Sequence, residues 1–286
     1  MSETELLSKI AARAKRAGLA QGGGIVTGIG DDCAIFRQKG SSRDLVFTAD
    51  MMHEGVHFTW DEAPEDVGWK ALARSLSDCA AMGAKPLFAL VSLAAPADAV
   101  SWIDGFYDGF FKLARKHGVV LAGGDLSATQ RISCDVTVCG EVPRGKAMLR
   151  SSARAGERVC VSGALGKAAL ALDTRGRFRP APRVELGLAL LASGVRCAMD
   201  LSDGLSMDLA RLCAASDCGA LIDDVPIAKG ASLRHALHGG EDYELLFTLP
   251  AKAKLPRGSV VIGTVTKSAV LFRGELLKPE GWDHFR

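Results

Sequence analysis

The chain has 286 residues, of which 48% are hydrophobic, so it can bury a sizeable core and its length favours two domains. A formal net charge of +2, without a dense run of lysine or arginine, argues against nucleic acid as a partner. No stretch reaches the ~18 consecutive apolar residues of a membrane span, and residues 2–16 are too mixed in charge for a signal peptide. The eight cysteines contain no Cys-x-x-Cys pair and lie mostly in apolar runs, which favours reduced thiols. We therefore expect a cytoplasmic protein that binds neither nucleic acid nor membrane.

Apolar periodicity predicts the elements of the first half. Helices are expected at 3–17, 64–82 and 101–117, where apolar residues recur at helical spacing. Strands are expected at 45–49, 88–93, 119–122 and 132–142. In the first of these strands Thr48 and Asp50 face away from Leu45, Phe47 and Ala49, because side chains alternate along a strand.

A polar and basic stretch at 144–156 marks a domain boundary, and we predict domains at 1–146 and 147–286. In the second domain strands are expected at 158–161, 220–222, 243–249 and 260–265, with helices at 167–172, 183–192 and 204–215. The elements do not follow the strict βαβ rhythm of a doubly wound sheet. The sequence therefore predicts an α+β fold with two mixed α/β domains.

The positions of the aspartates are the unusual feature of this sequence. Most of them stand beside glycine or serine at predicted strand ends: Asp31 and Asp32 after GIG, Asp50, Asp125 after a Gly-Gly turn, and Asp200 and Asp203 around Ser202. Asp78 lies on a stripe of small residues on a predicted helix. An ionised aspartate is rarely buried without a partner, because removing its charge from water is costly.

Two explanations of these aspartates stay open at this point. For a single aspartate a turn or helix-cap role is commoner, so Asp203 could cap the next helix and Asp78 could pair with an arginine. Several carboxylates in this recurring setting instead favour a shared set of oxygen ligands. Such a set suits Mg²⁺, which takes one or two carboxylates per ion and leaves positions for phosphate oxygens.

Common nucleotide-binding and hydrolytic motifs are absent from the sequence. Residues 163–167 read GALGK, which is shorter than a Walker A motif and is followed by Ala168. We interpret residues 162–166 as a strand-to-helix turn, with contact to a phosphate as the alternative. No protein-kinase motif set, serine nucleophile elbow or HExxH is present.

An ordered set of motifs resembles the thiamine-monophosphate kinases, within the superfamily of aminoimidazole ribonucleotide synthetase and selenophosphate synthetase. In the first half they are GIGDDCA from Gly28, TAD from Thr48, VHF from Val56, ALARSLSDCAAMGAKP from Ala71 and GGD from Gly123. In the second half they are MLRSSARAGERVCVSG from Met148, RPAPR from Arg179, DLSDGLSMDLARL from Asp200, GGEDYELLF from Gly239 and a final GWDHF. The last two motifs indicate this family rather than its relatives.

The resemblance implies an aminoimidazole ribonucleotide synthetase-like homodimer whose N-terminal sheets pair between subunits. It implies that ATP phosphorylates thiamine monophosphate to thiamine diphosphate with several Mg²⁺ ions. The implied metal ligands are Asp32, Thr48, Ala49, Asp50, Asp78, Asp125, Asp200 and Asp203. The implied ATP contacts are Gly124, Asp125, Arg150 and Ser202, with Tyr107 as a further candidate, and the implied thiamine contacts are His57, Glu241 and Trp282. Asp125, Arg150 and Asp203 are expected to act in catalysis.

The chain departs from the family pattern at three places. Ala49 replaces a common threonine, where a backbone carbonyl could still bind a metal, and Leu126 replaces the usual threonine after GGD. The segment between Leu172 and Arg179 is short for the family. We expect this shortening to remove a peripheral helix rather than part of the site.

The chemistry of the acceptor agrees with an aspartate-rich site. Thiamine monophosphate already carries an anionic phosphate oxygen, so no general base has to remove a proton, and positioning with charge neutralisation is enough. Two rivals remain: another ATP-using enzyme of the superfamily, and a non-catalytic nucleotide or thiamine-phosphate sensor. Selenophosphate synthetase would have a reactive cysteine near a glycine-rich N-terminus, and residues 22–24 have none beside them. A sensor would have lost metal carboxylates, and none is visibly lost.

Overall fold

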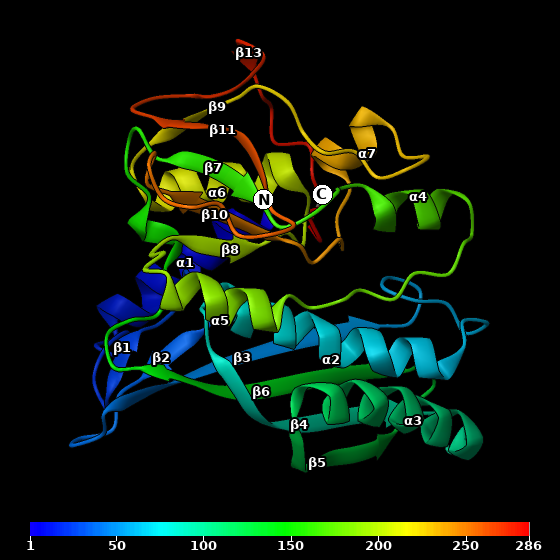
Figure 1. The fold of residues 1–286 in the computed structure, drawn as a ribbon. Coiled ribbons are helices and arrows are strands. Elements are labelled where there is room, and N and C mark those ends of the chain that lie inside the picture. Colours follow the sequence, from blue (N-terminus) through cyan, green and yellow to red (C-terminus); the bar gives the residue numbers. More distant parts are fainter. Residues whose placement is uncertain (286) are drawn as a thin grey trace.

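A computed structural model describes residues 1–285 and contains two mixed β-sheets, one from each half of the chain (Figure 1). The first sheet has the order β1-β2-β3-β6-β4-β5, and the second has the order β13-β12-β9-β11-β7-β10-β8. Only the β4–β5 pair and the β9–β12 pair are parallel among the strand pairs of the described residues. This is the α+β architecture that the sequence predicts.

The elements have the following bounds. The helices are α1 (Glu3–Arg16), α2 (Pro64–Ala81), α3 (Val100–His117), the short 3-10 helix η1 (Arg150–Ser152), α4 (Lys167–Asp173), α5 (Val184–Ala192), α6 (Leu205–Ala215) and α7 (Leu233–His238). The strands of the first sheet are β1 (Ile25–Thr27), β2 (Ala34–Phe36), β3 (Arg43–His53), β4 (Lys85–Ala95), β5 (Val120–Ala128) and β6 (Ser133–Pro143). Those of the second are β7 (Arg158–Val161), β8 (Ala198–Asp200), β9 (Gly219–Ile222), β10 (Leu245–Leu249), β11 (Val260–Thr266), β12 (Val270–Phe272) and β13 (Glu275–Leu276). None of the helices within residues 1–285 combines the length and apolarity needed to cross a membrane.

Helix α2 lies between the two halves of the molecule and contacts both. On one side it packs on α3, β3 and β6, and on the other it contacts α5, β8 and β10 (Figure 1). Close packing against α3 depends on two glycines, because a Cβ at Gly68 would lie 1.8 Å from the Phe106 carbonyl oxygen and one at Gly109 would lie 1.8 Å from that of Glu65. Helix α2 therefore presents its side chains to the junction between the two sheets.

Strand β3 separates its side chains as the alternation in the sequence predicts. Val46, Thr48 and Met52 are buried, whereas Ala49 and Met51 are exposed on the opposite face of the sheet. On strand β4 of the same sheet, Val91 is buried and Leu90 is exposed. The first sheet therefore has one face covered by helices and another face with apolar side chains open to solvent.

Strand β5 corrects the predicted position of Asp125. The strand extends from Val120 to Ala128, so the Gly-Gly-Asp segment lies within it and does not form a turn after it. Gly123 and Gly124 have φ of 147° and 150°, and a Cβ at Gly124 would lie 1.8 Å from the Val91 carbonyl oxygen. Only glycine fits this backbone. Strand β5 pairs only with β4 among the described strands and forms an edge of the sheet.

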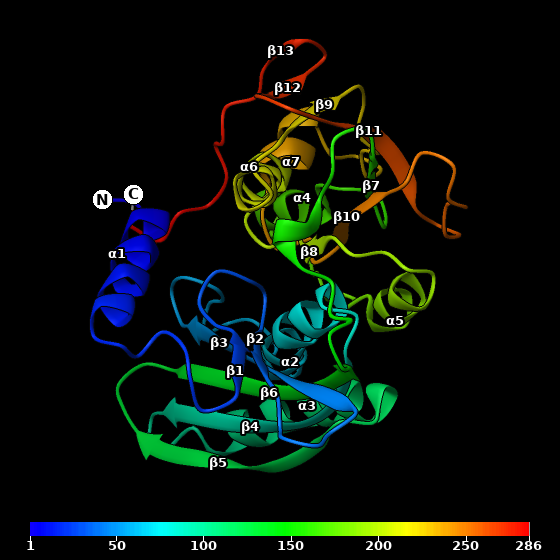
Figure 2. The ribbon, with the colours of Figure 1, turned by 90° about the vertical axis from the view of Figure 1, so that its left-hand side faces the viewer.

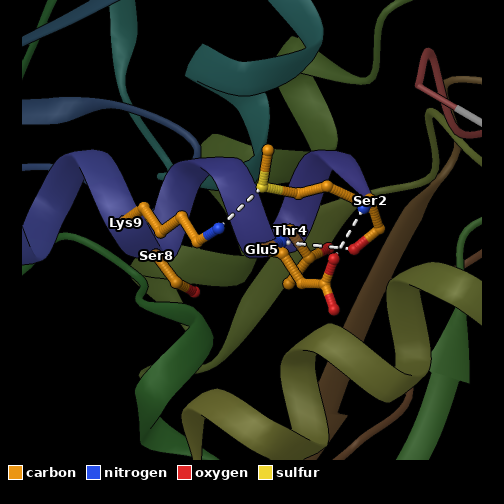
Figure 3. A pocket seen from close by; sticks show the side chains of 6 residues that line it. Ser2, Thr4, Glu5, Ser8 and Lys9 are labelled. Atoms are coloured by element: carbon orange, nitrogen blue, oxygen red, sulfur yellow. Dashed lines mark hydrogen bonds between the residues drawn. The ribbon is translucent and has the colours of Figure 1, made fainter.

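The two ends of the described chain lie side by side next to α1 (Figure 2). The backbone N–H of Glu3 donates a hydrogen bond of 3.2 Å to Asp283 Oδ1. Ser2 and Glu5 form a capping box at the start of α1, and Lys9 Nζ lies 2.9 Å from Met1 Sδ beside a shallow pocket (Figure 3). The residues that line this pocket all lie within 1–9 and include no aspartate, so the candidate site lies elsewhere.

Candidate active site

Three carboxylates from separate elements meet at the junction of the two sheets. Asp32 precedes β2, Asp78 lies in the last turns of α2, and Asp200 ends β8. One oxygen of each lies within 4.8 Å of the corresponding oxygens of the other two. We call Asp32, Asp78 and Asp200 the acidic triad. The structure thus brings together aspartates that are far apart in the sequence.

The neighbours of the acidic triad hold it in place. Arg150 of η1 donates a hydrogen bond of 2.5 Å from Nη2 to Asp32 Oδ1. The Thr48 hydroxyl donates a hydrogen bond to Asp78 Oδ2. Thr48 and Asp50 both stand on the helix-facing side of β3, where sequence alternation puts them. The adjacent Asp31 accepts weak hydrogen bonds from the backbone N–H groups of Asp32 and Arg150.

The electrostatics of the triad show uncompensated negative charge. Burial, followed by repulsion from Asp50, Asp200 and Asp32, raises the pKa of Asp78 well above its usual value. Burial and the neighbouring Asp32 likewise raise the pKa of Asp200. At Asp31 burial and Asp32 raise the pKa to about 7. These groups resist ionisation because the protein supplies few cations nearby.

Unpaired oxygens in the same region identify what the triad lacks. Asp32 Oδ2 and Asp50 Oδ2 are buried and have no hydrogen-bond partner within residues 1–285. A buried carboxylate oxygen without a partner is costly, and a hard divalent cation would satisfy it. The donor set consists of oxygen atoms, which Mg²⁺ prefers over sulfur or imidazole. The residues present therefore fit Mg²⁺.

Asp203 does not join the acidic triad. Its carboxylate forms an ion pair with Arg211, and its backbone N–H donates a 3.0 Å hydrogen bond to Asp208 Oδ2. Asp208 also accepts a hydrogen bond from Gly204 N, and burial together with Asp203 raises its pKa to about 7. The Ser202 carbonyl oxygen accepts a 2.7 Å hydrogen bond from Glu241 N. The segment at 200–204 is thus fixed by a buried carboxylate that sequence reasoning did not select.

Asp125 and Gly124 are separated from the triad within one chain. Asp50, Val136, Val91 and Gly124 form one row across β3, β6, β4 and β5. Three strand spacings of about 4.8 Å give a separation of roughly 14 Å between β3 and β5. Asp125 pairs with Ser92 and is exposed at the sheet edge.

Two other predicted contacts also lie away from the triad. Ala49 points to the open face of the sheet, opposite Thr48 and Asp50. Tyr107 on α3 packs among aromatic rings, with its ring centroid 5.6 Å from that of Phe111. A single chain therefore assembles only part of the predicted metal and nucleotide set.

The predicted thiamine contacts lie near one another, beside the N-terminal half of α2. The His57 ring lies 5.2 Å from the His284 ring, which lies 5.6 Å from the Trp282 ring. Trp282 is 52% exposed, and its backbone N–H donates a 3.0 Å hydrogen bond to the Asp203 carbonyl oxygen. Burial, with the charges of Arg74 and His284, lowers the pKa of His57 to about 3, so this ring is neutral at physiological pH.

Two basic residues of α2 join these groups and were missed from the sequence. Lys70 Nζ lies 2.6 Å from Glu241 Oε2 and 2.8 Å from the His57 carbonyl oxygen. Arg74 lies between Asp50 and Glu241, at 3.7 and 3.6 Å. Lys70, Arg74 and Asp78 are four residues apart along α2, which places them on one face of the helix. The four-residue spacing could have indicated from the sequence that these side chains share a face, but the same spacing is also typical of a solvent-exposed helix face.

Comparison with known proteins agrees with this geometry. Residues 30–142 match the family described as AIR synthase related protein, N-terminal domain. The thiamine-monophosphate kinase of Salmonella typhimurium is 37% identical over 265 residues, covering 82% of this chain and 79% of the relative. The chain belongs to the thiamine-monophosphate kinases. A solved structure described as AaThiL complexed with AMPPCP and TMP superposes with a TM-score of 0.89 at 31% identity, covering 99% of this chain and 97% of the other. The thiamine-monophosphate kinase of Stenotrophomonas maltophilia superposes with a TM-score of 0.77 at 36% identity, covering 93% and 96%.

The three acidic residues of the family motif at 239–244 contact different partners. Asp242 accepts hydrogen bonds from the backbone N–H groups of Gly166 and Ala168. Glu244 binds the Ser162 hydroxyl and the Arg183 guanidinium. Glu241 alone turns toward Lys70 and Arg74, from a backbone with φ of 66° that non-glycine residues seldom adopt.

The segment between Leu172 and Arg179, which was expected to be short for the family, is anchored on α2. Arg177 and Arg179 both form ion pairs with Asp66. The Trp69 indole donates a 2.7 Å hydrogen bond to the Pro180 carbonyl oxygen, and the Arg179 guanidinium lies 5.4 Å from the centroid of the Trp69 ring. This connection is therefore fixed at the N-terminal end of the helix that carries Lys70, Arg74 and Asp78.

Proposed function

We propose that the acidic triad holds Mg²⁺ for the reaction of this family. The chain is a thiamine-monophosphate kinase (EC 2.7.4.16), which uses ATP to convert thiamine monophosphate to thiamine diphosphate. The observation that carries the metal proposal is the approach of three carboxylates within 4.8 Å, with an oxygen of Asp32 that lacks a partner. Bound Mg²⁺ would neutralise phosphate charge in the transition state.

The reaction needs positioning and charge more than proton transfer. An oxygen of the acceptor phosphate attacks the γ-phosphorus of ATP, one P–O bond forms, and the P–O bond to ADP breaks. Because that oxygen is already anionic, no side chain has to act as a general base. The low pKa of His57, about 3, makes its neutral ring a weak base, which agrees with a site that needs no general base.

We propose the following roles for the candidate residues. Asp32, Asp78 and Asp200, with Thr48, Asp50, Asp203 and the Ala49 carbonyl, bind the metal ions. Arg150, Ser202, Gly124, Asp125 and Tyr107 contact ATP, with Arg150, Asp125 and Asp203 closest to the chemistry. His57, Glu241 and Trp282 bind thiamine, with the half-exposed Trp282 ring available to stack on the thiazolium cation.

We further propose that the working enzyme is a homodimer in which a second chain supplies Asp125. Asp125 stands roughly 14 Å from β3 of its own chain by strand spacing, at an exposed sheet edge. The open face of the same sheet carries Met51 and Leu90, which are 53% and 39% exposed. An unpaired edge beside exposed apolar side chains favours pairing with another copy. The division into domains at 1–146 and 147–286, and a cytoplasmic location, are parts of the same proposal.

The experiment that tests the reaction is an analysis of products. Purified protein is incubated with ATP and thiamine monophosphate, with Mg²⁺ or with excess EDTA, and thiamine diphosphate and ADP are separated by chromatography. We expect equal amounts of the two products with Mg²⁺ and none with EDTA. Binding of both substrates without any product would favour the sensor. Turnover only with aminoimidazole precursors or with selenide would favour another enzyme of the superfamily.

A further inference from the structure

Arg74 is a buried guanidinium whose hydrogen-bonding capacity is not used. Its side chain is only 13% exposed, and Nε is buried without a hydrogen-bond partner in the described part of the chain. Its Nη atoms stand 3.7 Å from Asp50 Oδ1 and 3.6 Å from Glu241 Oε1, beyond hydrogen-bond length. By contrast, the Arg37 guanidinium donates two hydrogen bonds of 2.7 Å to the carboxylate of the buried Asp44.

The other cations in this region already have close partners. Arg150 donates its 2.5 Å hydrogen bond to Asp32. Lys70 contacts Glu241 at 2.6 Å and the His57 carbonyl at 2.8 Å. A guanidinium carries five donors arranged for planar, bidentate binding of a phosphate. Arg150 also has an unpartnered Nε, but its Nη2 is held by Asp32, whereas neither Nη of Arg74 has a carboxylate at hydrogen-bond distance.

The position of Arg74 matches one phosphate in particular. It stands between Asp50, which neighbours the acidic triad, and Glu241, which belongs to the thiamine side. The phosphate of thiamine monophosphate must lie between these same two groups, because its organic part occupies one and its reacting oxygen faces the other. An acceptor phosphate placed there would otherwise meet mainly carboxylates, and their charge would repel it.

We propose that Arg74 binds the phosphate of thiamine monophosphate and thereby positions the acceptor oxygen. This inference rests on the proposed function, since it assigns a residue to the acceptor of that reaction. On binding, the guanidinium exchanges its two long ion pairs for direct hydrogen bonds to phosphate oxygens. The role follows from the placement of Arg74 on α2, one helical turn from Lys70 and one from Asp78.

The test compares two ligands that differ only in the phosphate. Binding of thiamine monophosphate and of thiamine is measured by calorimetry, with Mg²⁺ and without ATP, for the wild-type chain and for Arg74→Gln. We expect Arg74→Gln to weaken binding of thiamine monophosphate by about 10- to 100-fold, the scale of a lost charge-assisted hydrogen bond. Binding of thiamine and of AMPPCP should change little, and KM for thiamine monophosphate should rise more than KM for ATP.

Two further variants control for a structural role. Arg43→Gln removes an arginine with a similar 3.7 Å ion pair, to Glu141, at the far end of β3 and should change neither ligand. Arg74→Lys keeps the positive charge but lacks the planar guanidinium, so it should fold as the wild type does. It should lose affinity for thiamine monophosphate alone, and the loss should be smaller than in Arg74→Gln. Three results for Arg74→Gln would overturn the inference: equal weakening of thiamine and thiamine monophosphate binding, unchanged binding of thiamine monophosphate, or selective loss of AMPPCP binding. The proposed function is judged separately, by the turnover of the wild-type chain.

Discussion

Arg150 Nη2 lies 2.5 Å from Asp32 Oδ1, and this contact joins segments that are 118 residues apart. Asp32 precedes the first sheet's strand β2, whereas Arg150 begins the connection to the second sheet. The same guanidinium is the closest protein cation to the acidic triad. The pair therefore couples the junction between the halves of the molecule to the charge of the site.

Asp203→Asn tests whether Asp203 acts on a metal or only holds Arg211. Asparagine keeps the shape of aspartate, and the repulsion between Asp203 and the buried Asp208 that it removes offsets the lost ion pair with Arg211, so thermal stability should change little. Turnover should fall by about two orders of magnitude or more, the scale of losing one preorganised electrostatic group at a reacting phosphate. Steady-state kinetics at low and high Mg²⁺ give the measurement, with the exposed Asp217→Asn as the control. If Arg211→Ala matches the loss in Asp203→Asn, the ion pair explains the effect and the metal role is wrong.

Asp78→Asn should stabilise the metal-free protein while it removes activity. Burial and three neighbouring aspartates disfavour the charge at this position, and asparagine can still accept the hydrogen bond from Thr48. Asp66→Asn on the same helix is the matched control. This variant should be less stable than the wild type, because the arginine partners of Asp66 favour its charge and lower its pKa. Urea unfolding in EDTA measures both. A less stable Asp78→Asn would mean that the carboxylate has a structural partner.

The raised pKa values predict how Mg²⁺ and pH act together on stability. For Asp31, Asp78 and Asp200 the folded pKa lies above the ordinary value of 3.8, reaching about 7 at Asp31. Their contribution to stability is complete below pH ~4 and is lost as pH rises through the folded pKa. In EDTA the melting temperature should therefore fall as pH rises from 5 to 8.

Added Mg²⁺ should reverse this trend, because the ion binds the deprotonated carboxylates. A hundredfold excess over Kd contributes about 2.7 kcal/mol to the free energy of unfolding. The Mg²⁺-induced increase in melting temperature should thus be larger at pH 8 than at pH 5.5. An increase that is absent, or that does not depend on pH, would argue against metal binding at the triad.

The homodimer can be tested by complementation between inactive chains. Light scattering at micromolar concentration should give the mass of two chains. If Asp125 acts in the neighbouring subunit, mixing Asp125→Asn with Asp200→Asn after reversible dissociation should restore about a quarter of the wild-type sites, since half of the dimers are mixed and each mixed dimer has one intact site. Each variant alone should stay inactive. A monomer in solution, or mixtures without recovered activity, would contradict the shared site.

Trp282→Ala should impair use of thiamine monophosphate rather than ATP. The indole is half-exposed beside His284, so its removal costs little core packing but deletes a surface for the thiazolium. We expect KM for thiamine monophosphate to rise by about 3- to 30-fold, in line with 0.5–2 kcal/mol for a cation–π contact. Trp60→Ala, which removes a similarly exposed indole from the loop between β3 and α2, is the control. A matching rise in KM for ATP would show that the C-terminal segment acts on the whole site.

Local patterns predicted the long elements well. Helices α2 and α3 follow from helical periodicity, and β3 and β6 from alternation, because each pattern reflects burial of one face. The strands β1, β2, β12 and β13 have at most three residues and were missed, since so short a run has no readable period. The extension of β5 through Gly123 and Gly124 was missed because glycine usually interrupts a strand, whereas here its positive φ fits the close approach to Val91.

The candidate site was predictable in kind but not in geometry. The repeated aspartates and the motifs pointed to a metal-dependent phosphotransferase, but no spacing rule could bring Asp32, Asp78 and Asp200 together, because their contact depends on the packing of two sheets against α2. Arg74 and Lys70 escaped notice because basic residues four apart on a helix usually face solvent. Their burial appears only when the loop at 239–244 is folded over them.

The most direct test of the metal proposal is anomalous diffraction from crystals grown with Mn²⁺, thiamine monophosphate and AMPPCP. Mn²⁺ accepts the same oxygen ligands as Mg²⁺ and can be located by its own scattering. We predict at least one anomalous peak about 2 Å from a carboxylate oxygen of the triad, the distance expected for such ligands, with the phosphates of both ligands nearby. Bound AMPPCP and thiamine monophosphate with no anomalous peak near Asp32, Asp78 or Asp200 would contradict the account.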